Sequence, residues 1–229
     1  MKSQENKNCY ASPAQRKILV ELVQRDILKD HFFLTGGTAL SVFYLHHRIS
    51  NDLDFFTLNS IDLSEIDFSL KAIWKNSYSK IKVSPNFLSV LIQNVKVDFV
   101  IDPVSLNEER NRYFFNPNQF VQIDTIQNIF TNKFCTIASR IEPKDFTDFY
   151  FLNRHLEVKS LKEIYQGAQS KDAIFDDPPT VAYQIEQGIQ FLQKNPDILP
   201  ELLVEFQLDD FLNFYQNTVD WIYHKMGKN

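Results

Sequence analysis

Cysteine is scarce in this chain of 229 residues, and long apolar runs are absent. The two cysteines, Cys9 and Cys135, are far apart and have no metal-ligand spacing, which argues against a disulfide scaffold. No apolar run approaches membrane-spanning length, and the first eight residues are polar, without the apolar core of a signal peptide. We therefore expect a cytoplasmic protein without a membrane partner.

The net charge of the whole chain is −5, but acidic residues are missing from one part of it. That acidic balance argues against tight, nonspecific nucleic-acid binding. Residues 71–97, however, contain no acid and five lysines, namely Lys71, Lys75, Lys80, Lys82 and Lys96. Two interpretations remain open: the stretch holds a polyanion, or it is a solvated lysine-rich hairpin.

Only five glycines occur, and two of them form the pair Gly36-Gly37. The pair follows His31–Thr35, a short apolar run that we expect to be a buried strand. It allows the backbone to turn sharply and to approach a ligand closely. We expect a helix from Thr38 to about residue 46, whose first amides would favour an anion.

Two carboxylates follow at a spacing of two, in the segment Asp52-Leu53-Asp54-Phe55. In an extended strand, Asp52 and Asp54 point the same way, while Leu53 and Phe55 point into the other layer. Converging carboxylates repel one another unless a cation lies between them. Mg²⁺ is the expected cation, because it takes hard oxygen ligands and is often held by one or two carboxylates together with substrate phosphates.

A third acid, Asp98, lies in the apolar run Val95–Ile101. Buried without a partner it would be costly, so we expect it on a strand beside Asp52 and Asp54, where three carboxylates could surround a pair of ions. The alternative is an edge carboxylate facing water. The first interpretation is favoured, because Asp102 would already serve as the strand-ending acid.

The remaining chain divides into segments of different character. We expect one helix from Ser12 to about Lys29, with Ser12 as its N-cap and Pro13 at its first position, and a second helix over Leu63–Lys75. Residues 103–123 are expected to be an irregular link between two lobes, and the chain from Asp124 onward to be helical with interruptions at prolines. Strands are expected at Lys80–Val83, Phe87–Gln93 and Val95–Ile101.

Asp145 and Asp148 lie three residues apart after Pro143, on one face of an expected helix. Acids in the first turn of a helix are common, because they interact favourably with the helix dipole. Spacing alone favours this structural interpretation.

Taken together, these segments resemble the AbiEii/AbiGii family of nucleotidyltransferase toxins, a branch of the DNA polymerase β-like nucleotidyltransferases. The first block of the resemblance is Gly36 to Leu40 together with Arg48 to Phe56, and the second is Val95-Lys96-Val97-Asp98. The resemblance covers roughly residues 30 to 155.

Two further blocks match with substitutions. The family pattern of an acid followed by a lysine five residues later reads Asn128 to Lys133 here, so the lysine is kept and the acid is replaced. The last block extends from Arg140 to Asp148 and has Lys144 where arginine is usual, which keeps the charge but loses the bidentate fork.

The resemblance implies an α+β fold: a polymerase β-like nucleotidyltransferase lobe, with a mixed β-sheet flanked by helices, over 1–105, and a mostly helical lobe completing the nucleotide site over 106–229. It implies a metal-dependent enzyme that transfers a nucleotide from NTP to an RNA acceptor, with tRNA as the expected class. Relatives are toxins of toxin–antitoxin or phage-defence systems, so a cognate antitoxin protein is an expected partner.

The resemblance also assigns roles to residues. Asp52, Asp54 and Asp98 would bind Mg²⁺ or Mn²⁺ and would be catalytic together with Lys133 and Asp145. The residues expected to bind the nucleotide are Gly36, Gly37, Thr38, Arg48, Ser50, Lys133, Lys144 and Asp148.

Three alternatives remain open. The same fold could modify a small molecule or a protein. An Asp-x-Asp glycosyltransferase is a second alternative, which the upstream glycine turn and Asp98 argue against. The third is an inactive member that only binds a partner, an interpretation that Asn128 keeps open.

Overall fold

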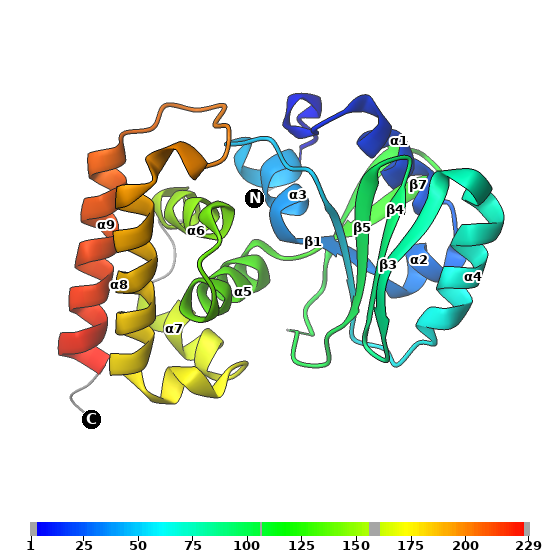
Figure 1. Ribbon diagram of the computed structural model, residues 1–229. Coiled ribbons are helices and arrows are strands. Elements are labelled where there is room, and N and C mark those ends of the chain that lie inside the picture. The colour runs from blue at the N-terminus through cyan, green and yellow to red at the C-terminus, as the bar shows by residue number, and fades with distance from the viewer. Residues whose placement is uncertain (1–3, 106, 156–160, 227–229) are drawn as a thin grey trace. The chain divides into compact units, whose positions relative to one another are not determined.

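The structure is a computed structural model that describes residues 4–105, 107–155 and 161–226. The chain forms two compact units, Met1–Ile126 and Gln127–Asn229 (Figure 1). The first contains a mixed β-sheet with flanking helices, and the second is helical, which confirms the predicted fold class. The first unit extends beyond the lobe of residues 1–105 expected from the sequence.

Seven strands form one sheet in the first unit, in the order β3-β4-β5-β2-β1-β7-β6. The sheet is mixed, because β2 runs parallel to β5 and antiparallel to β1. The expected strands around residues 31–35, 80–83, 87–93 and 95–101 are confirmed with small shifts in their ends. The strands are β1 Phe33–Thr35, β2 Leu53–Thr57, β3 Tyr78–Ser84, β4 Phe87–Ile92, β5 Val95–Ile101, β6 Asn111–Asn116 and β7 Gln119–Ile123.

The prediction of an irregular link over residues 103–123 is wrong. Residues of this segment form the hairpin β6–β7, and β7 pairs in parallel with β1 through Leu34 and Ile123. Pro117 lies in the turn between the two strands, where proline is compatible with a hairpin. Buried and partly exposed residues alternate along β7, as in a strand with one buried face.

Helices of the first unit are α1 Pro13–Leu22, α2 Asp26–His31, α3 Gly36–Leu40, which continues into the short turn η2 Ser41–Leu45, and α4 Leu63–Trp74. Ser12 caps α1 as expected, because its hydroxyl accepts a hydrogen bond from the Gln15 amide at 3.2 Å. The prediction of a single helix from Ser12 to Lys29 is wrong. Helix α1 ends at Leu22, and the backbone is extended at Arg25 before α2 begins. The helix expected from Thr38 begins at Gly36.

One face of the sheet is aromatic and buried. Phe99 of β5 stacks on Phe55 of β2, with ring centroids 5.6 Å apart, and meets the edge of Phe32 at 5.7 Å. Because side chains alternate along a strand, this packing directs Asp54 and Asp98 to the opposite face. The apolar core therefore determines which face of the sheet carries the acids.

Helices of the second unit are α5 Ile126–Ser139, α6 Pro143–His155, α7 Leu161–Gln169, α8 Pro178–Lys194 and α9 Leu208–Trp221. Proline occupies the first position of α6 and α8, as the sequence predicted. The unit has an aromatic core, in which Phe149 lies 4.8 Å from Phe134 and 6.2 Å from Tyr215, centroid to centroid. The helical character expected from Asp124 onward is confirmed.

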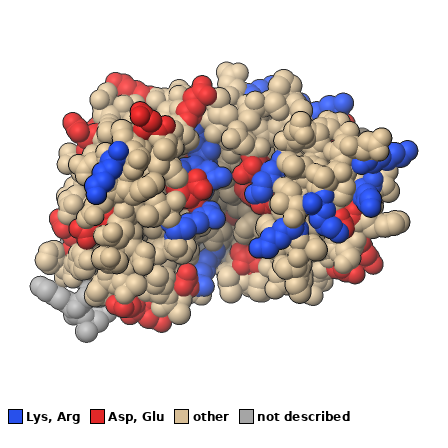
Figure 2. Space-filling view, in the orientation of Figure 1, with Lys and Arg blue, Asp and Glu red and all other residues tan. Residues whose placement is uncertain are grey.

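Within the described ranges, no helix has both the length and the apolar character needed to cross a membrane. The lysines of the stretch 71–97 lie on α4, in the turn that follows it, on β3 and on β5, and four of them are exposed: Lys71, Lys75, Lys80 and Lys82. Figure 2 shows several basic side chains on the face of the first unit that is turned toward the viewer. The exposure fits a solvated face, and binding of a polyanion there stays a prediction.

Gly188 of α8 tests how tightly the second unit is packed, because a Cβ there would overlap the ring of Phe146. We expect Gly188→Ala to lower the free energy of unfolding by about 1–3 kcal/mol, although alanine gains ~1 kcal/mol in helix propensity. Gly167→Ala is the control, since its Cβ would meet the nearest atom, Thr131 Oγ1, at 3.1 Å. Urea denaturation followed by circular dichroism measures both. Equal stability of Gly188→Ala and wild type would contradict the close packing.

Candidate functional site

A glycine turn connects β1 to α3 at the edge of the candidate site. Gly36 has φ of +67°, a conformation that residues with a Cβ rarely adopt. A Cβ on Gly36 would overlap the carboxylate of Asp54, and one on Gly37 would overlap the guanidinium of Arg48. Both glycines therefore allow charged side chains of the protein to approach the turn closely, and close approach of a ligand stays a prediction.

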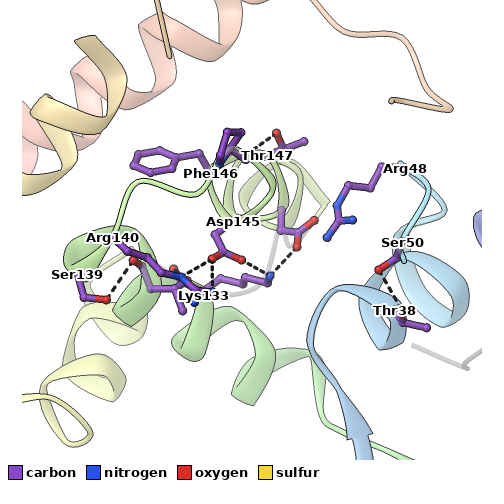
Figure 3. Close-up of polar contacts among 12 residues, drawn as sticks. Thr38, Arg48, Ser50, Lys133, Ser139, Arg140, Asp145, Phe146 and Thr147 are labelled. Atoms are coloured by element: carbon purple, nitrogen blue, oxygen red, sulfur yellow. Dashed lines mark hydrogen bonds and ion pairs between the residues drawn. The ribbon is translucent and has the colours of Figure 1, made fainter. Parts of the chain in front are cut away.

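Thr38 and Ser50 hold the two halves of the first sequence block together. The Thr38 hydroxyl lies 2.9 Å from the Ser50 hydroxyl, and it donates a short hydrogen bond to the backbone carbonyl of Asp52 (Figure 3). Gln15 of α1 donates to the same carbonyl at 3.3 Å. The backbone leading to Asp52 is thus fixed by contacts that do not use the Asp52 side chain.

Arg48 is buried beside the glycine turn, and its Nη1 donates to the Ile49 carbonyl at 2.9 Å. Its guanidinium lies where a Cβ on Gly37 would go. Packing of this kind supports the turn, and a contact of Arg48 with nucleotide stays a prediction.

Asp54 and Asp98 are direct register partners on the parallel strands β2 and β5. Adjacent strands lie ~5 Å apart, so the two carboxylates emerge side by side on one face. Asp52 precedes β2, which begins at Leu53. Leu53 and Phe55 are buried while Asp52 and Asp54 are partly exposed, as the alternation predicted. The structure therefore brings the three predicted acids to neighbouring positions on two paired segments.

Both oxygens of the Asp98 carboxylate have partners. Ser89 Oγ donates to Oδ1 at 2.6 Å, and Lys96 Nζ donates to Oδ2 at 2.7 Å. Burial lowers the pKa of Lys96, but the hydrogen bond with Asp98 and the charges of Asp98, Asp52 and Asp54 outweigh burial and raise it. The three acids thus act on one cation, the Lys96 ammonium.

The chemistry of Asp52, Asp54 and Asp98 can be compared with what a divalent metal ion requires. Carboxylate oxygens are the ligands that Mg²⁺ and Mn²⁺ prefer, and the acids already share one positive group. Within the described part of the chain, no three Asp, Glu, His or Cys side chains form a group arranged to hold a metal ion. The donor set thus suits a divalent ion in chemistry and charge, although the described side chains are not grouped as a metal site, and the metal stays a prediction.

In the second unit, Lys133 of α5 contacts both acids of α6. Its Nζ lies 2.6 Å from Asp145 Oδ1 and 2.7 Å from Asp148 Oδ2, and all three side chains are buried (Figure 3). Arg140 also contacts Asp145, at 2.8 Å. Burial raises the pKa of Asp145, but Lys133 and Arg140 outweigh burial and hold it below the usual 3.8. The acids therefore do more than occupy a first helical turn, which is the interpretation that spacing alone favoured.

Asn128, which replaces the family acid, is buried in α5 and accepts a hydrogen bond from Lys171. Lys171 also donates to Asn132 Oδ1 at 2.6 Å. Lys144 lies beside Asp145 in the first turn of α6 and is partly exposed. Asn128 is thus a partner of Lys171, a residue that the sequence did not single out.

Sequence reasoning also missed a buried pair beside the glycine turn. Thr35, the last residue of β1, donates to Asp124 Oδ2 at 2.6 Å, and Arg110 Nε lies 3.4 Å from Asp124 Oδ1. Asp124 directly follows Ile123, the last residue of β7, and an acid at the end of a strand was the available signal. The contact fixes the residue that precedes Gly36.

Comparison with known proteins gives one family match. The model of the family described as "Nucleotidyl transferase AbiEii toxin, Type IV TA system" matches residues 17–214. Comparison with curated proteins gives no match.

Two solved structures have similar folds. A nucleotidyltransferase structure from H. pylori has a TM-score of 0.57 and 17% identity, covering 97% of this chain and 98% of that one. MenT4, a nucleotidyltransferase toxin from Mycobacterium tuberculosis, has a TM-score of 0.56 and 12% identity, covering 92% and 82%. Nucleotidyltransferase folds therefore resemble this chain over nearly its whole length.

Asp145→Asn tests the charge cluster around Lys133. At pH 7 we expect it to lower the free energy of unfolding by about 3–5 kcal/mol, because a buried cation loses a partner. The folded pKa of Asp145 is lowered, so its contribution is present above the unfolded pKa of ~4 and is lost as pH falls through the folded value.

Denaturant unfolding at pH 7 and at pH 3 measures this dependence, and the difference from wild type should shrink at pH 3. Asp26→Asn is the matched control, because Asp26 pairs with Lys29 at 3.4 Å with its side chain 89% exposed. A surface pair of this kind contributes at most ~1 kcal/mol. A pH-independent difference for Asp145→Asn would contradict the assigned charge.

Proposed function

This chain belongs to the AbiEii family of nucleotidyltransferase toxins, and we propose that it transfers a nucleotide from NTP to an RNA acceptor in a metal-dependent reaction. We expect the acceptor to be tRNA. An acceptor hydroxyl would attack the α-phosphorus of the NTP, lose its proton and form a new P–O bond. The bond to the β-phosphate would break, and pyrophosphate would leave.

The observation that carries the proposal is the register pair Asp54 and Asp98, with Asp52 beside it. Bound Mg²⁺ or Mn²⁺ would lower the pKa of the acceptor hydroxyl and stabilise charge on the entering and leaving oxygens. The three aspartates would hold the ions. The contact of Lys96 Nζ with Asp98 Oδ2 at 2.7 Å supports this role, because a cation already lies against one of these carboxylates.

Backbone amides of Gly37 and Thr38 would bind the β- and γ-phosphates, together with Ser50. The turn suits this task because its first amides lie at the N-terminus of α3, where backbone N–H groups favour anions. Arg48, packed against the turn, would keep its shape. Thr38 would act through its backbone, since its hydroxyl contacts Ser50 and Asp52.

Lys133 would neutralise negative charge that develops on the triphosphate, which is the electrostatic part of catalysis. Asp145 and Asp148 hold its ammonium at 2.6 and 2.7 Å and so would orient it. Lys144 would add positive charge beside Asp145. Toxins of this family imply a partner that neutralises them, so we also propose a cognate antitoxin protein.

Asp52→Ala is the variant that tests the reaction. Its side chain is partly exposed, and the hydrogen bonds that fix this segment use its backbone carbonyl, so the fold should persist. We expect transfer to fall by at least about a hundredfold, because a predicted metal ligand is lost. Incubation with each labelled NTP, Mg²⁺ and total RNA measures the labelled product.

Asp67→Ala serves as the matched control, because Asp67 is paired with Lys80 at 2.7 Å in the same unit and has no predicted role in the reaction. It should label RNA as wild type does. Equal labelling by wild type and Asp52→Ala would refute the assignment. Label on a small molecule or a protein and never on RNA would instead select another acceptor.

A further inference from the structure

We propose that Lys96 is an internal competitor for the divalent cation, and that an ion binding at Asp98 must displace the Lys96 ammonium. The proposal rests on the proposed metal dependence and deepens it. Lys96 belongs to the lysine-rich stretch and to the second block of the resemblance, and neither assigned it a function.

The contact itself is the first argument. Lys96 and Asp98 are two residues apart on β5 and so share a face of the sheet. Lys96 Nζ lies 2.7 Å from Asp98 Oδ2, and Ser89 donates to the other oxygen at 2.6 Å. An ion that binds Oδ2 must therefore share this oxygen with an ammonium or replace the ammonium.

The second argument is charge. Asp54 is the register partner of Asp98 on the neighbouring strand, and Asp52 lies directly before that strand. The Lys96 ammonium that contacts Asp98 is positively charged at neutral pH, as lysine ordinarily is. A divalent ion among the same acids would experience repulsion from this positive charge at short range, and the repulsion weakens its binding.

The third argument is mobility of the competing group. The Lys96 side chain is 39% exposed, whereas that of Asp98 is 10% exposed. Lysine has a flexible four-carbon stem, so its ammonium can move into water while the carboxylate stays in place. Ser89 is buried and belongs to the paired strand β4, so it continues to orient Asp98 after the lysine leaves.

The chain offers a matched control for this proposal. Lys80 pairs with Asp67 at 2.7 Å, which is the same distance, and its side chain is 45% exposed. Lys80 lies on β3, and its hydrogen-bonded partner is not one of the three predicted metal ligands. Removing either lysine costs the protein one positive charge and one ion pair, but only Lys96 contacts Asp98.

The experiment measures the dissociation constant of Mn²⁺ alone, by electron paramagnetic resonance of free Mn²⁺, for the full chain without nucleotide. We expect Lys96→Met to bind Mn²⁺ at least about tenfold more tightly than wild type, because the competing charge is gone. Lys96→Arg, which keeps the charge, should stay within about threefold of wild type. Lys80→Met should be unchanged.

Unchanged or weaker Mn²⁺ binding by Lys96→Met would overturn the proposal. If Asp98→Asn weakened binding in the same series, the metal site itself would stand and only the competition would be refuted. Absence of Mn²⁺ binding by every variant would overturn the metal dependence as well. Thermal melting verifies folding, and Lys96→Gln, which can still donate to Asp98 without charge, replaces a methionine variant that does not fold.

Discussion

Repulsion among Asp52, Asp54 and Asp98 is the constraint on which the first unit depends. The parallel register of β2 and β5 places two of these carboxylates side by side, and the aromatic packing of Phe55 and Phe99 behind them keeps the strands in that register. Such a concentration of negative charge persists only if positive groups compensate it. Lys96 supplies the compensation from within the chain. The glycine turn is part of the same arrangement, because any residue with a Cβ at position 36 would overlap the Asp54 carboxylate.

In the second unit a lysine also compensates neighbouring carboxylates, and there the charged groups are more deeply buried. Lys133 lies between Asp145 and Asp148 with its side chain 9% exposed, whereas the Lys96 side chain is 39% exposed. A buried lysine held by two carboxylates has little freedom to change position, which suits a charge that must be oriented before a ligand binds. A half-exposed lysine can leave its partner. The difference in exposure is what separates a fixed charge from a displaceable one.

Sequence patterns predicted the places of the acids on the sheet better than the contacts among side chains. Alternation around Leu53 and Phe55 predicted which face carries Asp52 and Asp54, because a strand with one buried face allows only one register of side chains. The hairpin β6–β7 escaped prediction, since Pro117 and its polar neighbours indicate a turn without indicating strands on both sides. The contact of Asp145 with Lys133 could not be derived from helical spacing, because Lys133 lies in another helix, twelve residues away. Spacing along one helix says nothing about pairing between helices.

Replacement of the family acid by Asn128 was the feature that kept an inactive protein open as an alternative, since an anion that might orient Lys133 is missing. The structure supplies other anions to Lys133, because Asp145 and Asp148 both contact its ammonium from α6. Asn128 has its own partner in Lys171 and accepts a hydrogen bond through its amide oxygen. An amide oxygen accepts that hydrogen bond without adding a negative charge near Lys133. The substitution therefore changes the surroundings of Lys171 and leaves the acidic partners of Lys133 in place.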